Sequence, residues 1–564
     1  MRGPAEIDPT SGYPIARGLS RRELIQLIAA GAGATILAPL AATTAFAKQD
    51  ASPAAGTPGG EVKMLIRKPV TLNPYFSTSG NEQQIERLIF GALVKMSDVL
   101  VPTPDLAETV DVSDDASVYT FKLHEGITFN DGTPLTSADV QFTLERAIDT
   151  RTGSYWKGRL IGIKGAADYA DQKADSIVGI ETPDDLTIVL TMEKPNSAFL
   201  INLCNFAGLG ILPKHILEGV APEAMQEDPF TQAPTVTAGA FSFVKHEVDQ
   251  YLEVARSDKY FGTAPALDRM FLKIVTPDVG IAQLETGEID LMSLPISESE
   301  RVSKIDGLTV VAVPSPSMSF LALNMNSPKL QNKGMRQAMM QAIDRAGILA
   351  QVYQGQGEVT NSPIFGPEWM GVPEGLNEYA YDVDAAKAAL DASGWDKSQE
   401  IEMIVTVPTS KEDEAAAAII QEQLKQVGIT LKILNIDSAE LARRVIQGND
   451  YEVMYGGGGV FRADPSISAT YFLTTNFTPA GGNYSHYSNP QIDELYPQGT
   501  AVKDEAERKA VYTEIAKILN DELPWIYLWS PNSVYAFRNR LQGFQAPSYT
   551  NNKFWNAETW SVTE

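Results

Sequence analysis

The chain has few of the residues from which disulfides and metal sites are built. Among its 564 residues there is a single cysteine, Cys204, so no intramolecular disulfide or thiolate cluster can form. Cys204 stands in an apolar stretch, residues 200–207, which is typical of a packing residue. The four histidines show neither an H-x-x-x-H nor an H-E-x-x-H spacing. We therefore expect no metal and no cofactor.

Basic residues are also in the minority. The chain has 45 Lys and Arg against 71 Asp and Glu, which gives a formal net charge of −26. An acidic surface repels phosphate backbones and anionic headgroups, so we expect neither a nucleic acid nor a membrane surface as partner. The charge slightly favours a neutral or cationic ligand. The length suffices for two or three domains with a substantial core.

Long uncharged runs are lacking beyond the first 47 residues, which have the layout of an export signal. Arg21 and Arg22 precede an uncharged run that ends in Ala45-Phe46-Ala47, and the paired arginines resemble a twin-arginine signal. An uncleaved membrane anchor is the alternative, but the Gly, Ala and Thr content favours cleavage. No cysteine follows for a lipoprotein anchor, and residues 48–60 predict a flexible leader. We expect the mature protein in the periplasm or on the outer face of the cytoplasmic membrane.

The stretch 401–459 predicts alternating strands and helices. Three strands are expected, at residues 401–407, 429–436 and 451–455. A long helix that ends at Gly428 and a short helix capped by Ser438 separate them. This order forces parallel strands with right-handed crossovers, and ligands bind beyond the carboxyl ends of such strands. The predicted ligand site is formed by residues 408–410, 437–438 and 456–462.

Several shorter patterns predict further elements. Residues 119–123 alternate as a half-buried strand, and Thr136 with Asp139 predicts a helix start. Residues 178–190 predict a hairpin around Pro183-Asp184-Asp185. Apolar stripes at residues 335–343 and 511–519, and the strand 525–529, are expected to be core rather than a cofactor site.

A run of short motifs in fixed order resembles a known family. Its members are Arg87 to Val94, Pro104 to Glu108, Ser113-Asp114-Asp115, Tyr119 to Leu123 and Gly126 to Thr136, closed by Asp139-Val140. They resemble the diagnostic block of the family 5, peptide/nickel-type solute-binding proteins of ABC importers. Further matches extend over essentially the whole mature chain: Gly239-Ala240-Phe241, Tyr260-Phe261-Gly262, Leu284 to Asp290, Arg336 to Arg345, Asn483-Tyr484-Ser485, Asn489 to Asp493 and Leu523 to Ile526.

The resemblance implies an α/β, two-lobe periplasmic-binding-protein fold, type II-like, of the large class with an extra subdomain and a hinged cleft. Lobe one would comprise residues 61–314 with 535–564, including the extra subdomain 101–207, and lobe two residues 315–534. A small-molecule or oligopeptide solute would close the lobes, and the closed monomer would deliver it to an ABC permease in the membrane without chemistry.

The resemblance also bears on the solute. Peptide-binding relatives commonly place an aspartate before the Asp464-Pro465 element, where this chain has Phe461. Dipeptide binders carry an arginine after the strand corresponding to 401–407, but residues 408–411 contain none. Because an unpaired buried charge is costly, these differences argue against a free dipeptide. The candidate ligand-binding residues are Phe76, Trp156, Trp369, Tyr455, Phe461 and Arg462.

Each candidate has an alternative role. The aromatic side chains could be core or rim, and Arg462 could pair with Asp464 or a surface acid. The glycines 456–459 could cradle a phosphate, but a backbone lying flat against the solute or the opposite lobe is the simpler explanation. Asp111, Asp114 and Asp115 are expected to form a solvated turn rather than a calcium site.

The rival function is an exported hydrolase acting on glycosides or peptides. The chain has no G-x-S-x-G or H-E-x-x-H motif and no cysteine–histidine arrangement, and close carboxylate pairs are inevitable among 71 acids. A pure adhesion or chaperone-like surface protein would not need two lobes. We therefore predict a binding protein and not an enzyme.

Overall fold

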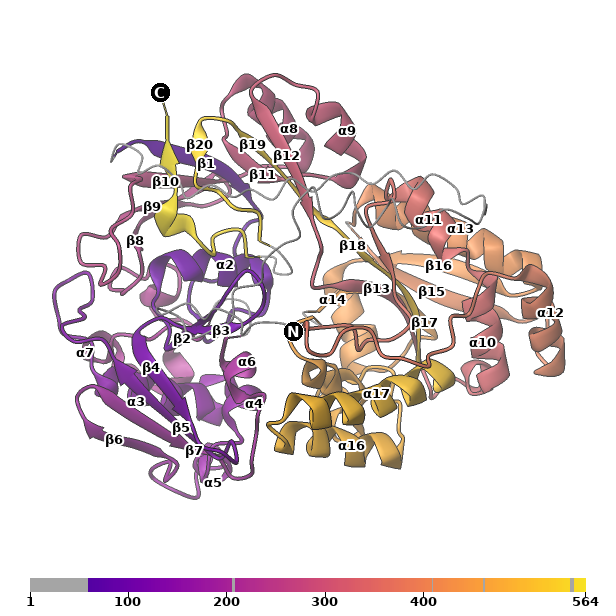
Figure 1. Cartoon of the computed structure of the whole chain (residues 1–564), viewed down its shortest axis with the longest axis horizontal. Helices are drawn as coiled ribbons and strands as arrows, with labels where there is room; N and C mark the ends of the chain where they lie inside the picture. The colour runs from indigo at the N-terminus through magenta and orange to yellow at the C-terminus, as the bar shows by residue number, and fades with distance from the viewer. Residues whose placement is uncertain (1–58, 205–207, 408, 460–461, 548–551, 564) are drawn as a thin grey trace, which may run out of the picture. The chain divides into compact units, whose positions relative to one another are not determined.

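The structure is a computed structural model that describes residues 59–204, 208–407, 409–459, 462–547 and 552–563. The expected signal peptide, most of the expected leader and the candidate Phe461 lie outside these residues. Two large mixed sheets and one smaller sheet organise the described part (Figure 1). None of its helices is both long enough and apolar enough to cross a membrane.

The first large sheet has seven strands, and we call this sheet with its helices the first lobe. Its strands are β1 (Glu61–Ile66), β8 (Phe241–Glu247), β9 (Tyr251–Arg256), β10 (Arg269–Ile274), β11 (Leu291–Ser293), β12 (Leu308–Val313) and β19 (Ser533–Arg538). Their order is β12-β19-β11-β1-β10-β9-β8. The central strand β1 runs parallel to β10 and β11, and the outer pairs are antiparallel.

A four-stranded antiparallel sheet lies between β1 and β8 in the sequence. It consists of β4 (Ala107–Val112), β5 (Val118–Leu123), β6 (Ile180–Asp184) and β7 (Thr187–Thr191), in the order β4-β5-β7-β6. The predicted strand 119–123 and the predicted hairpin are therefore confirmed. Thr136 and Asp139 form a capping box at the start of α3 (Ser137–Ile148), as the spacing predicted. Ser113 and Ser117 bond Asp115 in the predicted solvated turn.

The second large sheet has six strands, and we call it with its helices the second lobe. Its strands are β13 (Met318–Leu323), β14 (Gly357–Val359), β15 (Glu400–Thr406), β16 (Thr430–Ile436), β17 (Val453–Gly458) and β18 (Trp525–Pro531), in the order β14-β18-β13-β17-β15-β16. β15 runs parallel to both β16 and β17, which confirms the predicted topology. Gly428 ends the long helix with a φ of 101°.

Two details of the predicted β-α-β-α-β unit are wrong. Asp437, and not Ser438, caps the short helix, because its carboxylate accepts a hydrogen bond from the Glu440 amide at 2.8 Å. The glycines after Tyr455 continue the strand to Gly458 instead of forming a loop. A Cβ on Gly456 would lie 2.6 Å from the Phe320 ring on the neighbouring strand β13, so a close packing contact within the sheet requires glycine at this position.

The chain passes between the two large sheets twice. It leaves the seven-stranded sheet after Val313 and enters the six-stranded sheet at Met318. It returns between Pro531, at the end of β18, and Ser533, at the start of β19. Residues 314–317 and 532 are therefore the two crossovers.

Helices cover the sheets, and α13 packs beside β16 at the right of Figure 1. The remaining short strands are β2 (Val94–Met96), β3 (Pro102–Pro104), β20 (Leu541–Gln542) and β21 (Ser561–Val562). The other helices are α2 (Gly80–Ile89), α4 (Lys157–Leu160), α5 (Ala166–Ala170), α6 (Phe199–Cys204), α7 (Lys214–Leu217), α8 (Pro277–Thr286), α9 (Ser299–Val302), α10 (Lys333–Ala342), α11 (Arg345–Val352), α12 (Val383–Ala392), α13 (Lys411–Val427), α14 (Ser438–Leu441), α15 (Ala469–Phe472), α16 (Pro490–Ala501) and α17 (Glu505–Glu522).

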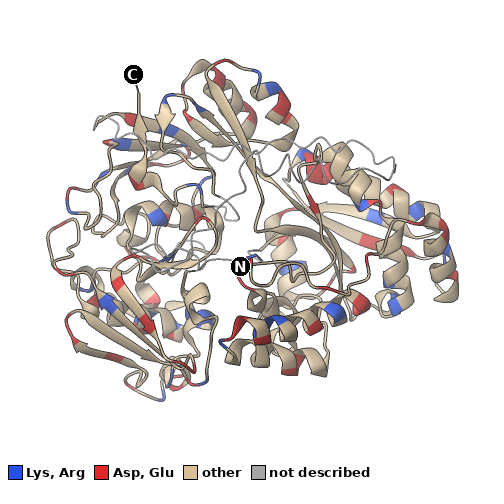
Figure 2. Ribbon diagram, viewed as in Figure 1, with Lys and Arg blue, Asp and Glu red and all other residues tan. Residues whose placement is uncertain are grey.

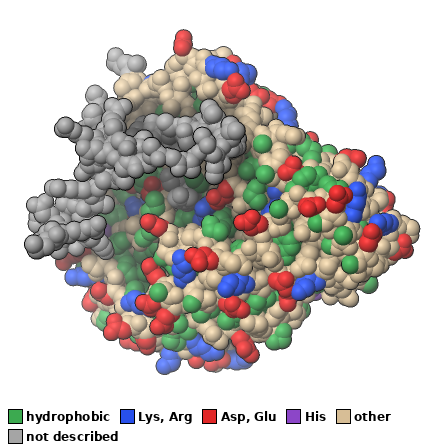
Figure 3. Space-filling view, turned by 45° about the vertical axis from the view of Figure 1, so that its right-hand side comes forward, with side chains coloured by type: hydrophobic (Ala, Val, Ile, Leu, Met, Phe, Trp, Pro, Cys, Tyr) green, Lys and Arg blue, Asp and Glu red, His purple; other side chains and the backbone are tan. Residues whose placement is uncertain are grey.

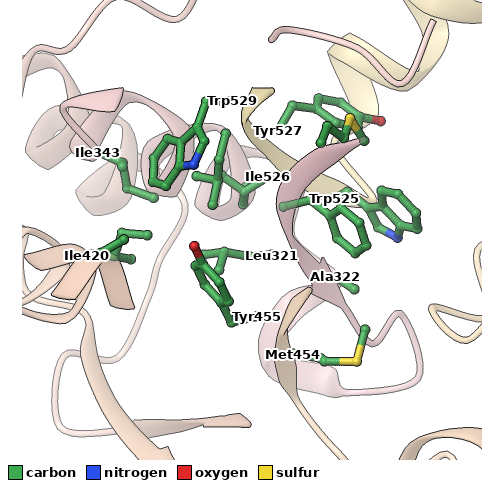
Figure 4. Packing of buried hydrophobic residues seen from close by; sticks show 14 of the residues in the cluster. Leu321, Ala322, Ile343, Ile420, Met454, Tyr455, Trp525, Ile526, Tyr527 and Trp529 are labelled. Atoms are coloured by element: carbon green, nitrogen blue, oxygen red, sulfur yellow. The ribbon is translucent and has the colours of Figure 1, made fainter. Parts of the chain in front are cut away.

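The core of the second lobe contains the stripes that the sequence predicted (Figure 4). Leu321 and Ile526, on neighbouring strands, point to the side where Ile343 and Ile420 lie, whereas Trp525 points to the other face. All five side chains are at most 1% exposed. Burying such side chains contributes roughly 1.5–3 kcal/mol each. The predicted core role of the residues in 335–343 and 525–529 is therefore confirmed.

Candidate functional site

The carboxyl ends of the parallel strands converge on Asp413, in the first turn of α13. Its Oδ1 atom accepts hydrogen bonds from the hydroxyls of Tyr353 (2.8 Å) and Tyr455 (3.1 Å). Its Oδ2 atom accepts hydrogen bonds from the hydroxyls of Thr409 (3.2 Å) and Ser410 (2.8 Å). Burial and then the Asp413 carboxylate raise the pKa of Tyr455, so this phenol is a neutral donor. The second lobe's own side chains thus occupy both Asp413 oxygens.

Arg462 joins the segment after β17 to the first crossover. Its Nε atom donates to the carbonyl oxygen of Ser315, in the crossover 314–317, at 2.8 Å. Its guanidinium also forms an ion pair with Glu358 on β14 and lies 4.9 Å from the centroid of the Phe365 ring. Of the two acid partners considered for Arg462, Asp464 or a surface acid, the structure shows the surface acid, Glu358. Because Ser315 lies between the sheets, Arg462 connects the predicted ligand segment to the connection about which the lobes would move.

Asp464 instead forms a buried ion pair with Arg508 of α17. The Arg508 Nη2 atom lies 2.8 and 2.9 Å from the two carboxylate oxygens, and the side chains are 7% and 4% exposed for Arg508 and Asp464. Burial disfavours the charged guanidinium, but Asp464 and Tyr512 outweigh burial and raise the pKa of Arg508. The ring of Trp369 stacks 4.9 Å from this guanidinium. This pair fixes the start of the segment that follows Arg462.

The same segment, residues 462–471, reaches the first lobe. Ala463 belongs to the hydrophobic core cluster of the first lobe, and Ile467 packs against that cluster. Farther along, the ring of Tyr471 of α15 packs at an angle of 56° against Trp525 of the second lobe, with ring centroids 5.3 Å apart. We call residues 462–471 the junction segment, because its side chains contact both lobes.

In the first lobe, the loop at residues 74–76 is bonded to the start of α4. The Trp156 indole nitrogen donates to the carbonyl oxygen of Pro74 at 2.9 Å, and the Tyr155 amide donates to that of Tyr75 at 2.8 Å. Trp156 is 2% exposed, whereas Phe76 is partly exposed and packs edge-on against Tyr75. These bonds hold the loop at 74–76 against the helix start.

A second contact between the lobes involves the subdomain that carries the four-stranded sheet. The amide and hydroxyl of Ser197 donate to the carbonyl oxygen of Thr500 at 2.8 and 3.1 Å. The Lys503 ammonium lies 3.5 Å from the carbonyl oxygens of Val112 and Ser113. The end of α16 therefore touches the first lobe at a second place, apart from the junction segment.

The family model described as "Bacterial extracellular solute-binding proteins, family 5 Middle" matches residues 101–479, more than half of the chain. The chain belongs to this family of extracellular solute-binding proteins. Membership confirms the predicted family and the predicted class of function, a solute-binding receptor of an import system.

Relatives of this solute-binding protein extend over most of its length. The oligopeptide-binding protein AppA of Bacillus subtilis is 25% identical over 532 residues, covering 90% of this chain and 93% of AppA. A Brucella melitensis protein described as an ABC transporter peptide-binding protein is 28% identical over 472 residues, covering 82% of this chain and 85% of its own.

Solved structures confirm the α/β, two-lobe fold. The substrate-binding protein CtaP of Listeria monocytogenes has a TM-score of 0.78 at 27% identity and covers 90% of this chain and 100% of its own. The structure of AppA with a nonapeptide has a TM-score of 0.79 at 24% identity, with the same coverage. The latter likeness concerns the fold alone.

The candidate residues named from the sequence occupy different places. Phe76 is partly exposed in the first lobe, Arg462 is partly exposed within the junction segment, and Trp369 stacks on Arg508. Trp156 and Tyr455 are buried, and their polar atoms bond protein groups. Phe461 lies outside the described residues.

Sequence reasoning missed the pair Asp464–Arg508 and the side chains of Tyr155, Arg159 and Tyr471. Arg508 stands in a charged run at the start of a helix, a pattern that also fits a solvated face. The sequence did offer one signal for Arg159: it follows the aromatic pair Tyr155-Trp156 at a spacing of about one helical turn, which would allow the arginine to contact these rings. The pairing of residues 464 and 508 is set by tertiary structure.

Two further features of the described residues are the clustering of ionisable side chains and the distribution of charge. In the part of the chain that the structure describes, no group of three or more His, Cys, Asp and Glu side chains is arranged to hold a metal. Acidic and basic residues are interspersed along the ribbon (Figure 2) and over the face in Figure 3.

Two surface depressions lie away from the junction segment, one along α8 and one between α10, α12 and α17.

Proposed function

We propose that this protein captures a peptide-like or other small solute between its two lobes and delivers it to an ABC permease in the membrane. The observation that carries this proposal is the junction segment, where residues of the second lobe pack on the first lobe beyond the end of the parallel strand β17. In a two-lobe receptor, a solute that binds both lobes shifts the equilibrium toward the closed form.

The relatives favour a peptide as the solute. AppA is named an oligopeptide-binding protein, and its structure holds a nonapeptide. A peptide longer than two residues also agrees with Phe461 and with the absence of arginine from residues 408–411. The comparisons give no support to the exported hydrolase, and we propose that the solute leaves the protein chemically unchanged.

We propose that Phe76, Trp369, Phe461 and Arg462 contribute to solute binding, with Trp156 and Tyr455 as the buried support beneath them. Phe461→Ala should weaken solute binding, because it removes the side chain at the sequence position where peptide-binding relatives commonly place an aspartate. Lys411→Ala is the control, because this side chain is 81% exposed and forms a long ion pair of 3.8 Å with the equally exposed Asp278. A larger loss of affinity for Lys411→Ala than for Phe461→Ala would contradict the assignment of Phe461 to the solute site.

We also propose the lobe boundaries 61–314 with 535–564 and 315–534, and the extra subdomain 101–207. The positions of the two crossovers and of the four-stranded sheet support these boundaries. The receptor is proposed to be monomeric and to expose its lobes for docking on the permease. Sedimentation in the presence and absence of solute tests the monomer, since a shift to a dimer with solute would contradict it.

Residues 1–47 are proposed to be a cleaved twin-arginine export signal, followed by the leader 48–60. Cleavage after Ala47 predicts that the exported protein begins at Lys48. Mass spectrometry of the exported N-terminal peptide checks this. Arg21→Lys with Arg22→Lys should abolish export, and export unchanged by the double substitution would contradict the twin-arginine route.

Native mass spectrometry of the freshly purified protein tests the function itself. We expect a fraction of molecules to carry one additional mass, which fragmentation after denaturation identifies as a peptide. Release of an intact non-peptide solute would show that the proposed class of solute is wrong, but it would still support the proposed receptor function. A protein that carries no solute and gains no thermal stability from oligopeptides would contradict the peptide proposal.

A further inference from the structure

Arg159 lies on an aromatic platform where the first lobe faces the junction segment. Its guanidinium carbon is 4.2 Å from the centroid of the Tyr155 ring and 5.7 Å from that of Trp156. Its Nη2 atom donates a hydrogen bond to the Tyr155 hydroxyl at 2.7 Å. The ring contacts and this hydrogen bond restrict the orientation of the guanidinium plane.

Arg159 differs from the other arginines of the site in its electrostatic partners. Arg462 is paired with Glu358, and Arg508 is paired with Asp464. Among the residues that the structure describes, no carboxylate lies within 4.0 Å of the Arg159 guanidinium. A partly buried arginine that bonds only one phenol retains most of its five N–H donors for another acceptor.

The second lobe lies within electrostatic reach of Arg159. Burial raises the pKa of Tyr471, and Tyr155 and Arg159 then shift it in opposite directions, which places both side chains near this residue of the junction segment. Tyr471 is itself partly exposed, and its ring packs at a tilt against Trp525. Arg159 is therefore a first-lobe side chain close to Tyr471 of the junction segment, the region to which the proposed function assigns solute capture.

We propose that Arg159 binds a carboxylate group of the solute, a role that rests on the proposed capture of a peptide-like solute between the lobes. A planar guanidinium can donate two parallel hydrogen bonds to one carboxylate, and the aromatic platform prepares it for this geometry. The carboxylate anchor that residues 408–411 lack would thus come from the first lobe. In a chain of net charge −26, one local cation of this kind is needed to hold an anionic group.

The carboxylate could be the carboxyl terminus of a peptide or an acidic side chain. Three pools of synthetic oligopeptides of mixed sequence separate these sources: neutral peptides with a free carboxyl terminus, the same peptides amidated, and amidated peptides that contain one Asp or Glu. Native mass spectrometry selects the best-bound peptide of each pool, and calorimetry measures its affinity for the full-length exported protein.

Arg159→Met is the test substitution and Arg146→Met its control. Arg146 also stacks on an aromatic ring four residues before it, 5.4 Å from Phe142, but it bonds the carbonyl oxygen of Glu218 away from the junction segment. We expect Arg159→Met to weaken binding of the carboxylate-bearing peptides about 10- to 100-fold, the usual effect of a hydrogen-bonded charged group. The amidated neutral peptides should bind both forms with equal, weak affinity.

The outcomes separate this inference from the proposed function. If the wild-type protein binds the peptides and the Arg159→Met variant keeps both the affinity and the preference for a carboxylate, the proposed role of Arg159 is wrong. The proposed receptor function is not affected by that result. A wild-type protein that binds none of the three pools overturns the peptide proposal, and this role with it. Circular dichroism and thermal unfolding of Arg159→Met show whether its loss of binding reflects loss of folding, and Arg159→Lys, which keeps the charge, is measured beside it.

Discussion

Asp464→Asn should destabilise the protein because it leaves Arg508 charged, buried and without its counter-ion. The asparagine keeps the size of the side chain and can still accept the hydrogen bond from the Ser466 amide, which is 2.9 Å from Asp464 Oδ1. The charge that faces the guanidinium is lost, and one of the two oxygens that accept from Arg508 becomes an NH2 donor. The substitution therefore isolates the ion pair from the turn that the same side chain caps.

The expected cost is about 3–5 kcal/mol, the usual penalty for removing one partner of a buried ion pair. The high end applies here, since the two side chains are 4% and 7% exposed and both carboxylate oxygens are bonded. Asp464→Ala should cost about 1 kcal/mol more, because it also removes the cap. Arg508→Met combined with Asp464→Asn should recover part of the loss, since no buried charge then lacks a partner.

Urea unfolding followed by tryptophan fluorescence gives the free energies of the four forms in this double-mutant cycle. We expect a coupling of more than about 1 kcal/mol between residues 464 and 508. Arg443→Met, which breaks an exposed pair with Glu440, is the matched control and should change stability little. A loss below about 1 kcal/mol for Asp464→Asn, or strictly additive effects, would refute the view that this pair anchors the junction segment.

Three further predictions concern the first lobe. Gly239→Ala should destabilise by about 1–3 kcal/mol or more, because its Cβ would lie 2.3 Å from the Ile89 carbonyl carbon, whereas Gly219→Ala meets no atom within 4 Å and should fold normally in thermal melts. Burial raises the pKa of Glu86 from 4.5 to about 8, so the folded state binds the Glu86 proton more tightly than the unfolded chain does. The stability that comes from this proton binding is complete below pH 4.5 and is lost as the pH rises through 8. Glu86→Gln should therefore be more stable than wild type above pH 8 and similar below pH 4.5 in urea unfolding, and a parallel pH dependence of both proteins would contradict this. Burial raises the pKa of the Cys204 thiol, so iodoacetamide should label it only in denaturant, and rapid labelling of the native protein would show that it is accessible.

Much of the scaffold was predictable because its signals are local. The alternation at 119–123, the stripe at 335–343 and Gly428 each specify one element through its own residues. The order of strands and helices at 401–459 then fixed parallel pairing, since chirality leaves few alternatives. The correct topology for β15, β16 and β17 follows from these two steps.

The motifs that identified the family mostly build the scaffold. Asp105 accepts a hydrogen bond from the Ala92 amide at 3.0 Å and faces the buried Arg87, and Gly239 admits the backbone of α2. These roles explain why the family could be predicted from the sequence while the solute could not. A scaffold residue constrains its immediate neighbours, whereas a solute is selected by side chains at the surface of the site.

The junction segment was only partly predictable. Its place after the third strand followed from topology, but the partners of Asp464 and Arg462 lie 44 and 104 residues away in sequence, at Arg508 and Glu358. No local pattern distinguishes these acids and bases from others in the chain. Gly456 shows the same limit, since its close neighbour Phe320 is brought there by an antiparallel strand that the glycine run does not reveal.

The central claim is that this protein holds a solute and makes or breaks no bond in it. The most direct measurement is to add one equivalent of the peptide that native mass spectrometry identifies, and then to recover and weigh it after prolonged incubation. We predict a complex of one peptide per chain, a raised melting temperature and a peptide of unchanged mass. Recovery of shortened peptides in amounts exceeding the protein would contradict the account.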